Sequence, residues 1–221
     1  MRPLLVLRPE PGASATVKRA RELGLEPVAA PLFEIEPLPW EAPEPGGFDA
    51  LLLTSANAVR HGGSKLAKLR GLRVYAVGDA TAEAARESGF DIAATGDAGI
   101  DRLLGSIEAE LKLLHLCGED RREPDDCRQR ITSIPVYRAR PVASPDLSAA
   151  AGSIALIHSP RAARRLAELV DDRNSIAVAA ISRAAADATG SGWQVVKAAH
   201  EPTDDALLAL AAELCNNPQP K

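Results

Sequence analysis

The sequence has few aromatic residues and no long apolar run. Phe, Trp and Tyr make up 3% of the 221 residues, whereas hydrophobic residues together make up 46%. A buried core must therefore be built from Ala, Leu, Val and Ile. No stretch approaches the ~20 apolar residues of a membrane-spanning helix, and the first apolar run, PLLVL, is too short for a signal peptide. These absences predict a cytoplasmic protein without a membrane partner.

The chain also lacks the cysteines of a disulfide framework and the positive charge of a general nucleic-acid binder. Its three cysteines, Cys117, Cys127 and Cys215, match neither a zinc ribbon nor a C-x-x-C redox pair. An odd number of thiols without such spacing indicates reduced cysteines in a cytosolic protein. The formal net charge of −4 argues against nucleic acid as the partner.

Several common catalytic and cofactor motifs are missing. No strand is followed by G-x-G-x-x-G, GGSK at 62–65 lacks the spacing of a phosphate-binding loop, and there is no G-x-S-x-G elbow. A lone histidine such as His158 is more often structural than a ligand. The histidines show no metal-ligand spacing: His61, His115, His158 and His200. Three Asp pairs have no second carboxylate cluster or histidine beside them in the sequence, and we interpret them as solvated faces or helix caps (125–126, 171–172 and 204–205).

What the sequence does contain is a repeated pattern of short apolar run, small polar turn and helix. In residues 51–59, LLLTSANAV, three leucines precede a Thr-Ser-x-Asn cluster and the start of a helix. Ser and Asn can cap that helix, or the turn can be a binding site, because ligands bind at the carboxyl ends of parallel strands. Near-continuous apolar strands that alternate with helices predict an α/β fold with parallel sheets.

An internal repeat indicates two similar lobes. Residues 48–90 resemble residues 152–193: each runs twice through strand, small polar turn and Ala-rich helix, and closes on glycine and an aromatic residue. The alternative is a chance similarity between two ordinary βαβ segments.

Two extended, proline-marked segments flank the first copy of the repeat, at 30–39 and 134–142. We therefore predict a first lobe made of residues 1–35 and 140–221, with residues 36–139 inserted as the second lobe. The two crossing segments would form a two-stranded β hinge between the parallel-sheet lobes.

The predicted strand ends share small residues, hydroxyl groups or an arginine. Helix N-termini at such turns offer unpaired N–H groups and a partial positive charge, which suit carboxylates and phosphates. Any one arginine there is best explained as an exposed helix position, but the set predicts a polyanionic ligand, held largely by backbone donors, with no metal. The arginines on or near the turns and the hinge are Arg8, Arg60, Arg121, Arg122, Arg138, Arg161 and Arg183.

The order and spacing of short motifs along the whole chain resemble the uroporphyrinogen-III synthase family. The matching segments are VLRPEPGA near the start, P-x-FEIEP at 31–37, FDALLLTSANAV at 48–59, VYAVGDATAEAARESGF at 74–90, LCGEDRR at 116–122, IPVYRARP at 134–141, HSPRAA at 158–163, AISRAAA at 180–186 and the closing AHEPTDDALLAL. The resemblance implies two α/β lobes joined by a two-stranded ladder.

The resemblance also implies a reaction, which is the cyclisation of hydroxymethylbilane, a linear tetrapyrrole with eight carboxylates. Loss of the terminal hydroxyl gives an azafulvene, and attack through a spiro intermediate inverts ring D before closure to uroporphyrinogen III. The family uses no cofactor, and uncatalysed closure gives the wrong isomer. The implied protein is a monomeric, cyclising lyase of tetrapyrrole biosynthesis that makes transient contact with the preceding enzyme of the pathway.

Carried over by position, Tyr137 matches the family tyrosine proposed to help the hydroxyl leave. The residues expected to bind substrate lie in the matching turns: Arg8, Thr54, Ser55, Asn57, Thr81, Gly118, Ser159 and Arg161. Ala184 and Ala185 stand where many relatives carry threonines, and His158 stands where Phe or Thr is commoner, so side-chain contacts from those two turns are not expected to follow the family.

Two alternatives remain open from the sequence. Tyr137 can be a half-buried residue that only packs between the lobes, because Tyr favours strands. The chain can also be a non-catalytic, two-lobed protein that binds a small polyanion. A receiver-like signalling domain is disfavoured because no acidic pair clusters at a strand end.

Overall fold

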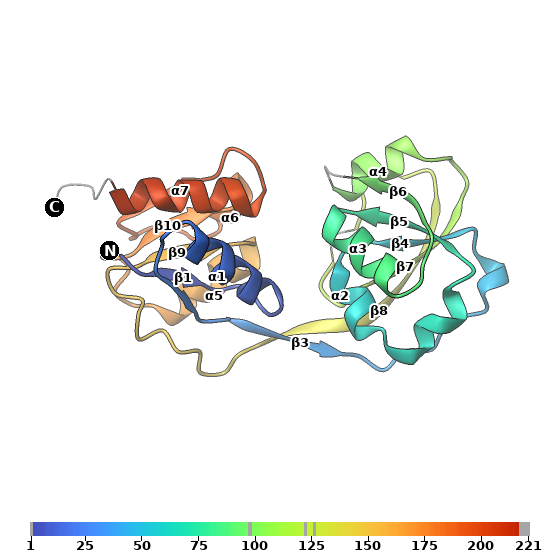
Figure 1. Ribbon diagram of the computed structural model, residues 1–221, viewed down its shortest axis with the longest axis horizontal. Coiled ribbons are helices and arrows are strands. Elements are labelled where there is room, and N and C mark those ends of the chain that lie inside the picture. The colour runs from blue at the N-terminus through green and yellow to red at the C-terminus, as the bar shows by residue number, and fades with distance from the viewer. Residues whose placement is uncertain (1, 97–98, 122, 126, 217–221) are drawn as a thin grey trace. The chain divides into compact units, whose positions relative to one another are not determined.

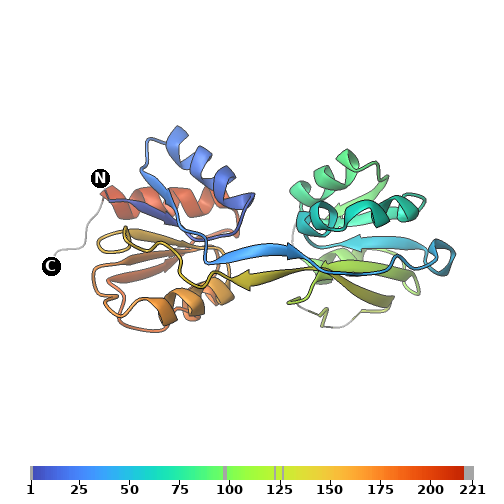
Figure 2. The same ribbon diagram turned by 90° about the horizontal axis from the view of Figure 1, so that it is seen from below.

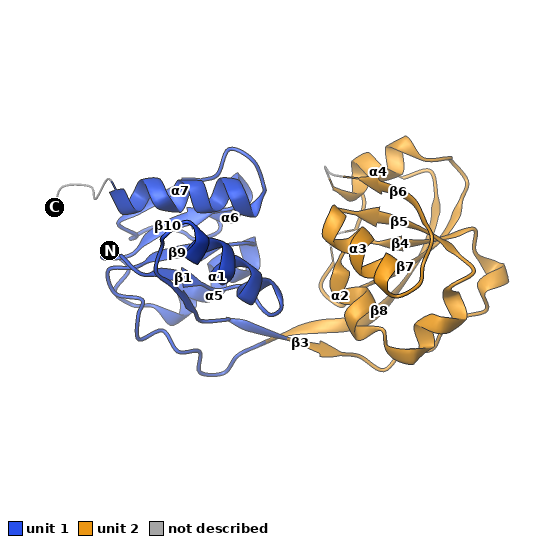
Figure 3. Ribbon diagram, viewed as in Figure 1, with its two compact units in different colours: residues 1–34, 141–221 blue, residues 35–140 orange. Residues whose placement is uncertain are grey.

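Strands and helices alternate along most of the chain (Figure 1). The computed structural model describes residues 2–96, 99–121, 123–125 and 127–216. Two compact units are present (Figure 3): unit 1 comprises residues 1–34 and 141–221, and unit 2 comprises residues 35–140. None of the helices in the described ranges is both long enough and apolar enough to span a membrane.

Unit 1 contains a five-stranded sheet in the order β11-β10-β9-β1-β2, and its neighbouring strands are parallel. Its strands are β1 (Leu4–Val6), β2 (Pro27–Ala29), β9 (Ile154–Ile157), β10 (Ala177–Ala180) and β11 (Val195–Ala198). Every residue of β1, β9 and β10 is buried. Strands covered on both faces need apolar residues on both faces, which explains the uninterrupted runs LLV, IALI and AVAA.

Helices cover both faces of this sheet (Figure 2). They are α1 (Gly12–Glu22), α5 (Pro160–Leu169), α6 (Arg183–Asp187) and α7 (Asp204–Asn216). One face carries α1 and α7, whose small and aliphatic side chains pack with Leu4, Val6 and Ile154 in one core cluster. The other face carries α5 and α6. Ser159 and Ser182 cap α5 and α6, because each Oγ accepts a hydrogen bond from a free backbone N–H of the first turn.

Unit 2 contains a six-stranded sheet in the order β3-β8-β7-β4-β5-β6. Its strands are β3 (Phe33–Pro37), β4 (Ala50–Leu53), β5 (Arg73–Val77), β6 (Ile92–Gly96), β7 (Lys112–Gly118) and β8 (Arg130–Pro141). The pairs from β8 to β6 are parallel. The chain enters unit 2 within β3 and leaves it within β8. These two strands run in opposite directions, since Leu38 N donates to Val136 O and Val142 N donates to Leu32 O, both at 2.9 Å.

The helical segments of unit 2 also lie on both faces of its sheet. They are a 3₁₀ turn (Pro45–Gly47), α2 (Ala56–His61), a second 3₁₀ segment (Gly63–Leu69), α3 (Asp79–Glu87) and α4 (Ile100–Ser106). Buried residues of α2 and α3 pack with Leu51, Leu53 and Leu114 on one face, whereas α4 packs with Leu52 and Leu113 on the other.

In each parallel sheet, the side on which the chain adds its successive strands changes once. In unit 1, β1 leads outward to β2 while β9 leads through β10 to β11 on the other side; in unit 2, β7 leads to β8 while β4 leads through β5 to β6. At such a switch point the loops diverge and leave room for a ligand at the carboxyl ends of the strands. The two switch points, β1/β9 and β4/β7, therefore locate the candidate sites.

Candidate functional site

The switch point of unit 2 brings together several residues that were predicted from the sequence to form the site. Thr54 and Ser55 follow β4, Gly118 ends β7, and Tyr137 lies on β8. Strands β4 and β7 are direct neighbours, and Gly118 is the register partner of Tyr137. Asn57 lies in the first turn of α2, directly after Ser55 and Ala56. Residues more than 80 positions apart in the sequence thus meet at one edge of one sheet.

A register shift between β7 and β8 places Tyr137 beside Gly118. Cys117 pairs with Pro135 but Gly118 pairs with Tyr137, so β8 contributes one extra residue, Val136, at this point. A Cβ atom on Gly118 would lie 2.9 Å from Cζ and 3.0 Å from the hydroxyl oxygen of Tyr137. Glycine is therefore required at position 118 for the tyrosine ring to lie against the strand.

The Tyr137 hydroxyl is hydrogen-bonded to the side chain of Ser55. Burial raises the pKa of Tyr137, the bond to Ser55 lowers it, and nearby Cys117 raises it, with a net increase. The phenol is thus protonated at neutral pH and able to donate. The Ser55 Oγ also accepts a hydrogen bond from Asn57 N at 3.2 Å, which confirms the predicted helix cap. The His61 ring lies 6.3 Å from the Tyr137 ring, centroid to centroid.

We expect Gly118→Ala to lower turnover by about 100-fold, because the added methyl group displaces the Tyr137 ring and small misplacements of a reacting group are costly. Gly71→Ala is the matched control, since no atom lies within 4 Å of a Cβ built there. Turnover and melting temperature should be measured for both variants. Wild-type turnover in Gly118→Ala would show that the position of Tyr137 is unimportant for the reaction.

His115 extends this site into the sheet. It lies on β7, is 1% exposed and contacts hydroxyl groups from two neighbouring segments. Its Nε2 is 3.1 Å from Thr54 Oγ1 and its Nδ1 is 3.3 Å from Ser133 Oγ. Burial, together with the positive charge of Arg121, lowers the pKa of His115 to about 4, although Glu123 acts in the opposite direction. The ring is therefore neutral at physiological pH. From the sequence, His115 was only one of four histidines without metal-ligand spacing.

Thr81 lies in the first turn of α3, after β5, and is 5% exposed. Its backbone N–H donates to Gly78 O at 3.1 Å. It follows β5, the strand next to β4, but is less accessible than Thr54 and Ser55, which are half-buried.

At the switch point of unit 1, four side chains from four segments form a network. Arg8 Nη1 donates to both carboxylate oxygens of Asp204, at 2.9 and 3.1 Å. Thr16 Oγ1 donates to Asp204 Oδ2 at 2.8 Å, and His158 Nε2 lies 3.0 Å from Asp204 Oδ1. The remaining ring nitrogen of His158 is buried and has no hydrogen-bond partner within the described ranges.

The structure corrects the interpretation of the Asp pair at 204–205. Burial alone would raise the pKa of Asp204, but the hydrogen bond from His158, the charge of Arg8 and the hydrogen bond from Thr16 together lower it to about 2. Asp204 is thus an ionised, partly buried residue with a histidine beside it. Asp205 is exposed and pairs with Arg19, as expected of a solvated residue.

The remaining predicted residues of unit 1 lie at the start of α5. Ser159 Oγ accepts a hydrogen bond from Ala162 N at 3.1 Å, and the Arg161 guanidinium carbon lies 4.5 Å from the centre of the Phe33 ring. These two residues and Arg8 follow the adjacent strands β9 and β1.

Many of the arginines that predicted a basic site face carboxylates of the same unit. Arg138 pairs with Glu36, which also binds Arg140. Arg121 pairs with Glu123 and Arg183 with Asp187. Arg122 and Asp126 lie outside the described residues. The positive charge available to a ligand is therefore smaller than the number of arginines indicates.

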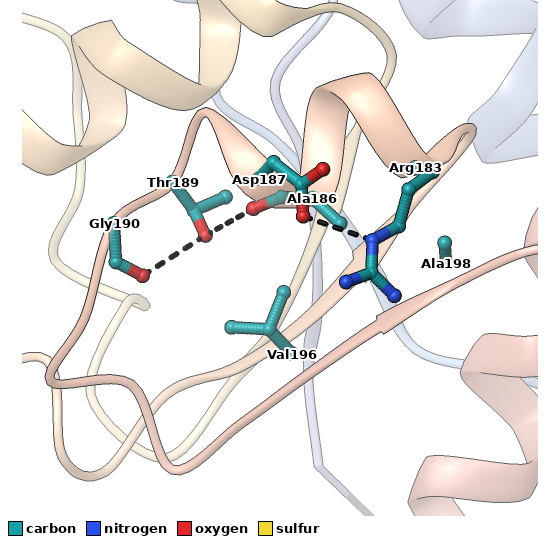
Figure 4. A pocket seen from close by; sticks show the side chains of 7 residues that line it. All are labelled: Arg183, Ala186, Asp187, Thr189, Gly190, Val196 and Ala198. Atoms are coloured by element: carbon teal, nitrogen blue, oxygen red, sulfur yellow. Dashed lines mark hydrogen bonds and ion pairs between the residues drawn. The ribbon is translucent and has the colours of Figure 1, made fainter.

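A pocket of about 330 Å³ lies at the edge of unit 1, between α6 and β11 (Figure 4). It is lined by Arg183, Ala186, Asp187, Thr189, Gly190, Val196 and Ala198. Its polar groups already have partners: Arg183 Nε donates to Asp187 at 2.9 Å, and Thr189 Oγ1 donates to Ala186 O at 2.7 Å. The pocket contains none of the predicted site residues except Arg183. No group of three or more His, Cys, Asp or Glu side chains suited to a metal ion occurs in the part of the chain that the structure describes.

Residues 14–209 match the family model described as uroporphyrinogen-III synthase HemD. The chain belongs to the uroporphyrinogen-III synthase family. Comparison with curated proteins by sequence gave no match. As a uroporphyrinogen-III synthase, the protein is an enzyme, a cyclising lyase of tetrapyrrole biosynthesis that converts hydroxymethylbilane to uroporphyrinogen III.

Solved structures of uroporphyrinogen-III synthases have the same fold. The enzyme from Helicobacter pylori matches with a TM-score of 0.64 and 20% sequence identity, over 97% of this chain and 100% of that one. A mutant of the enzyme from the extremely thermophilic bacterium Thermus thermophilus matches with a TM-score of 0.54 and 19% identity, over 98% of this chain and 100% of that one. The predicted α/β class with two parallel sheets is thereby confirmed.

Proposed function

We propose that Tyr137 is the acid that assists departure of the substrate hydroxyl when this chain cyclises hydroxymethylbilane. The observation that supports this role best is the place of the Tyr137 hydroxyl, which lies at the carboxyl ends of β4 and β7 and is hydrogen-bonded to Ser55. A ligand in a parallel α/β unit binds at such an edge.

The proposed step is a proton transfer coupled to cleavage of a C–O bond. The Tyr137 O–H donates its proton to the leaving hydroxyl oxygen, which departs as water, while the pyrrole nitrogen supplies the electron pair that forms the azafulvene. Ser55 lowers the pKa of Tyr137 through their hydrogen bond, so it stabilises the phenolate that develops. The proton released as the ring closes restores the phenol, and the net products are uroporphyrinogen III and water.

Binding of the substrate carboxylates is proposed to involve both units. In unit 2 the proposed donors are the side chains or backbone N–H groups of Thr54, Ser55, Asn57, Thr81 and Gly118. In unit 1 they are Arg8, Ser159 and Arg161. Within the described ranges, the bonds of Arg8 to Asp204 and Thr16 all use Nη1, and its other terminal nitrogen is proposed to donate to a carboxylate.

We further propose that units 1 and 2 are the two lobes of the enzyme, with residues 36–139 as the inserted lobe and β3 and β8 as the hinge. The protein is proposed to act as a monomer in the cytoplasm and to need no cofactor. Because free hydroxymethylbilane closes by itself to the wrong isomer, transient contact with the enzyme that supplies it would shorten its exposure to water.

The isomer of the product tests the proposed function. Purified protein is incubated with freshly prepared hydroxymethylbilane after exhaustive chelation and dialysis, and the oxidised products are separated as isomers. We expect isomer III to be the main product. In a control reaction with heat-denatured protein, we expect the isomer that forms without catalysis. Activity that disappears with the chelator and returns with a metal would contradict a cofactor-free enzyme. Binding of the substrate without isomer III would favour the non-catalytic polyanion-binding alternative.

A further inference from the structure

His115 is a polar residue in a strand that is otherwise apolar. Leu113, Leu114 and Leu116 surround it on β7, and all are fully buried. β7 lies between β4 and β8 in the sheet of unit 2 (Figure 3), so His115 has no access to water from the strand edges. A buried polar side chain costs free energy unless it is hydrogen-bonded. Both ring nitrogens of His115 meet that condition, one through Thr54 and one through Ser133.

The three side chains form a chain of hydrogen bonds with a direction. A neutral imidazole has one N–H donor and one nitrogen acceptor, and the depressed pKa of His115 keeps the ring neutral at pH 7. In one direction, Ser133 donates to Nδ1 and Nε2–H donates to Thr54, whose own proton is then free. In the other direction, Thr54 donates to Nε2 and Nδ1–H donates to Ser133, and the Thr54 proton is used within the protein.

We propose that His115 is a positioning residue that fixes Thr54 as a hydrogen-bond donor toward a substrate carboxylate. In this arrangement His115 carries its proton on Nε2 and donates it to Thr54 Oγ1, while Ser133 donates to Nδ1. The inference rests on the proposed function, because it assigns the Thr54 hydroxyl to the hydroxymethylbilane site.

The chemistry of the ligand decides between the two directions. An ionised carboxylate can only accept hydrogen bonds, so a hydroxyl that binds it must donate. The imidazole N–H occupies a lone pair of Thr54 Oγ1 and leaves the hydroxyl proton to point away from His115. Thr54 is half-buried and lies directly before Ser55, which is hydrogen-bonded to Tyr137. A carboxylate held by Thr54 binds at the same edge of the sheet as Tyr137, at the carboxyl ends of β4 and β7.

Kinetics of four variants test the role. His115→Leu removes both hydrogen bonds and fills the space with a side chain that suits the buried strand. It should raise KM for hydroxymethylbilane ~2–10-fold, the equivalent of one hydrogen bond. Its kcat should be nearly unchanged. Thr54→Val should raise KM to a similar extent, and the double variant should be no worse than either single one, because both remove the same interaction. His115→Gln should restore KM, since an amide also donates from one atom and accepts at another. Additive effects, or a wild-type KM in His115→Leu, would overturn the proposal.

The tautomer of His115 provides a readout that does not depend on activity. Long-range ¹H–¹⁵N correlation spectra of the full chain distinguish a protonated Nε2 from a protonated Nδ1. The set of imidazole signals that is missing from the spectrum of His115→Gln belongs to His115. We expect protonation on Nε2. Protonation on Nδ1 in a wild-type protein that makes uroporphyrinogen III would overturn the positioning role and leave the proposed function intact. A wild-type protein that makes no isomer III would overturn both.

Discussion

Tyr137→Phe is expected to lower turnover ~10²–10⁴-fold, the usual range for one positioned acid. The phenyl ring still fills the space beside Gly118, but the proton donor and the hydrogen bond to Ser55 are lost. Substrate binding should change little, because carboxylates are held by other groups. The measurement is steady-state formation of uroporphyrinogen III, with kcat and KM determined separately.

Tyr75→Phe is the matched control, because Tyr75 is the other tyrosine of the chain and lies on β5 of the same unit. Its turnover should stay at the wild-type level. If Tyr137 only packs in the core, Tyr137→Phe will be nearly silent, whereas Tyr137→Ala will lower the melting temperature. That pattern would assign Tyr137 to structure and leave catalysis to the backbone donors and the shape of the site.

Asp204→Ala is expected to destabilise the protein by about 3–5 kcal/mol, because it leaves Arg8 and His158 partly buried without their shared partner. For a chain of this size the melting temperature should fall by roughly 10 °C. Asp205→Ala is the matched control. Asp205 is the next residue, its side chain is 76% exposed and its ion pair is with exposed Arg19, so its loss should cost less than about 1 kcal/mol. Equal melting temperatures for the two variants would contradict a structural role for the network.

The same network should make stability depend on pH in the acid range. The pKa of Asp204 is lowered from 3.8 to about 2, so its ionised form is stabilised by folding. This contribution, about 2 kcal/mol, is complete above pH ~4 and is lost as pH falls toward 2. The stability difference between the wild-type protein and Asp204→Asn, measured by denaturant unfolding, should therefore shrink as pH falls from 5 to 2.5. A constant difference would show that the charge of Asp204 is not stabilised by its neighbours.

The sequence predicted the parallel sheets because strands covered on both faces must be apolar throughout, and runs such as LLV, IALI and AVAA leave little ambiguity. It did not indicate β6, whose segment IAATG is only partly buried and contains small residues at the edge of the sheet. An edge strand makes contact on one side only, so its composition is less constrained. The strand ends were predictable for the same reason as the strands: small polar residues interrupt an apolar run there.

The site was harder to predict, because its decisive contacts join distant residues. Asp204 gained its histidine from 46 positions away and its arginine from 196 positions away, and no local pattern records such pairs. The contact of Gly118 with Tyr137 depends on a register shift that β-propensity does not specify. The only indication of His115 in the sequence is weak: it is a polar residue in a run of leucines. Hydrophobic periodicity predicts that it lies in the strand but says nothing of its hydrogen bonds.

The insertion of unit 2 into unit 1 has a consequence for the order in which the chain can fold. Strand β1 lies inside the sheet and pairs with the central strand β9, and Arg2 donates to the carbonyl of Gly152, 150 residues away. During synthesis, β1 must wait with its apolar side chains incompletely covered until β9 and α7 have been made, whereas every strand of unit 2 is available by residue 141. The hydrogen bond from Leu38 to Val136 then holds the two ends of the inserted segment together. A folded insertion of this kind acts as a short loop, so it lowers the entropy cost of bringing β1 and β9 into register.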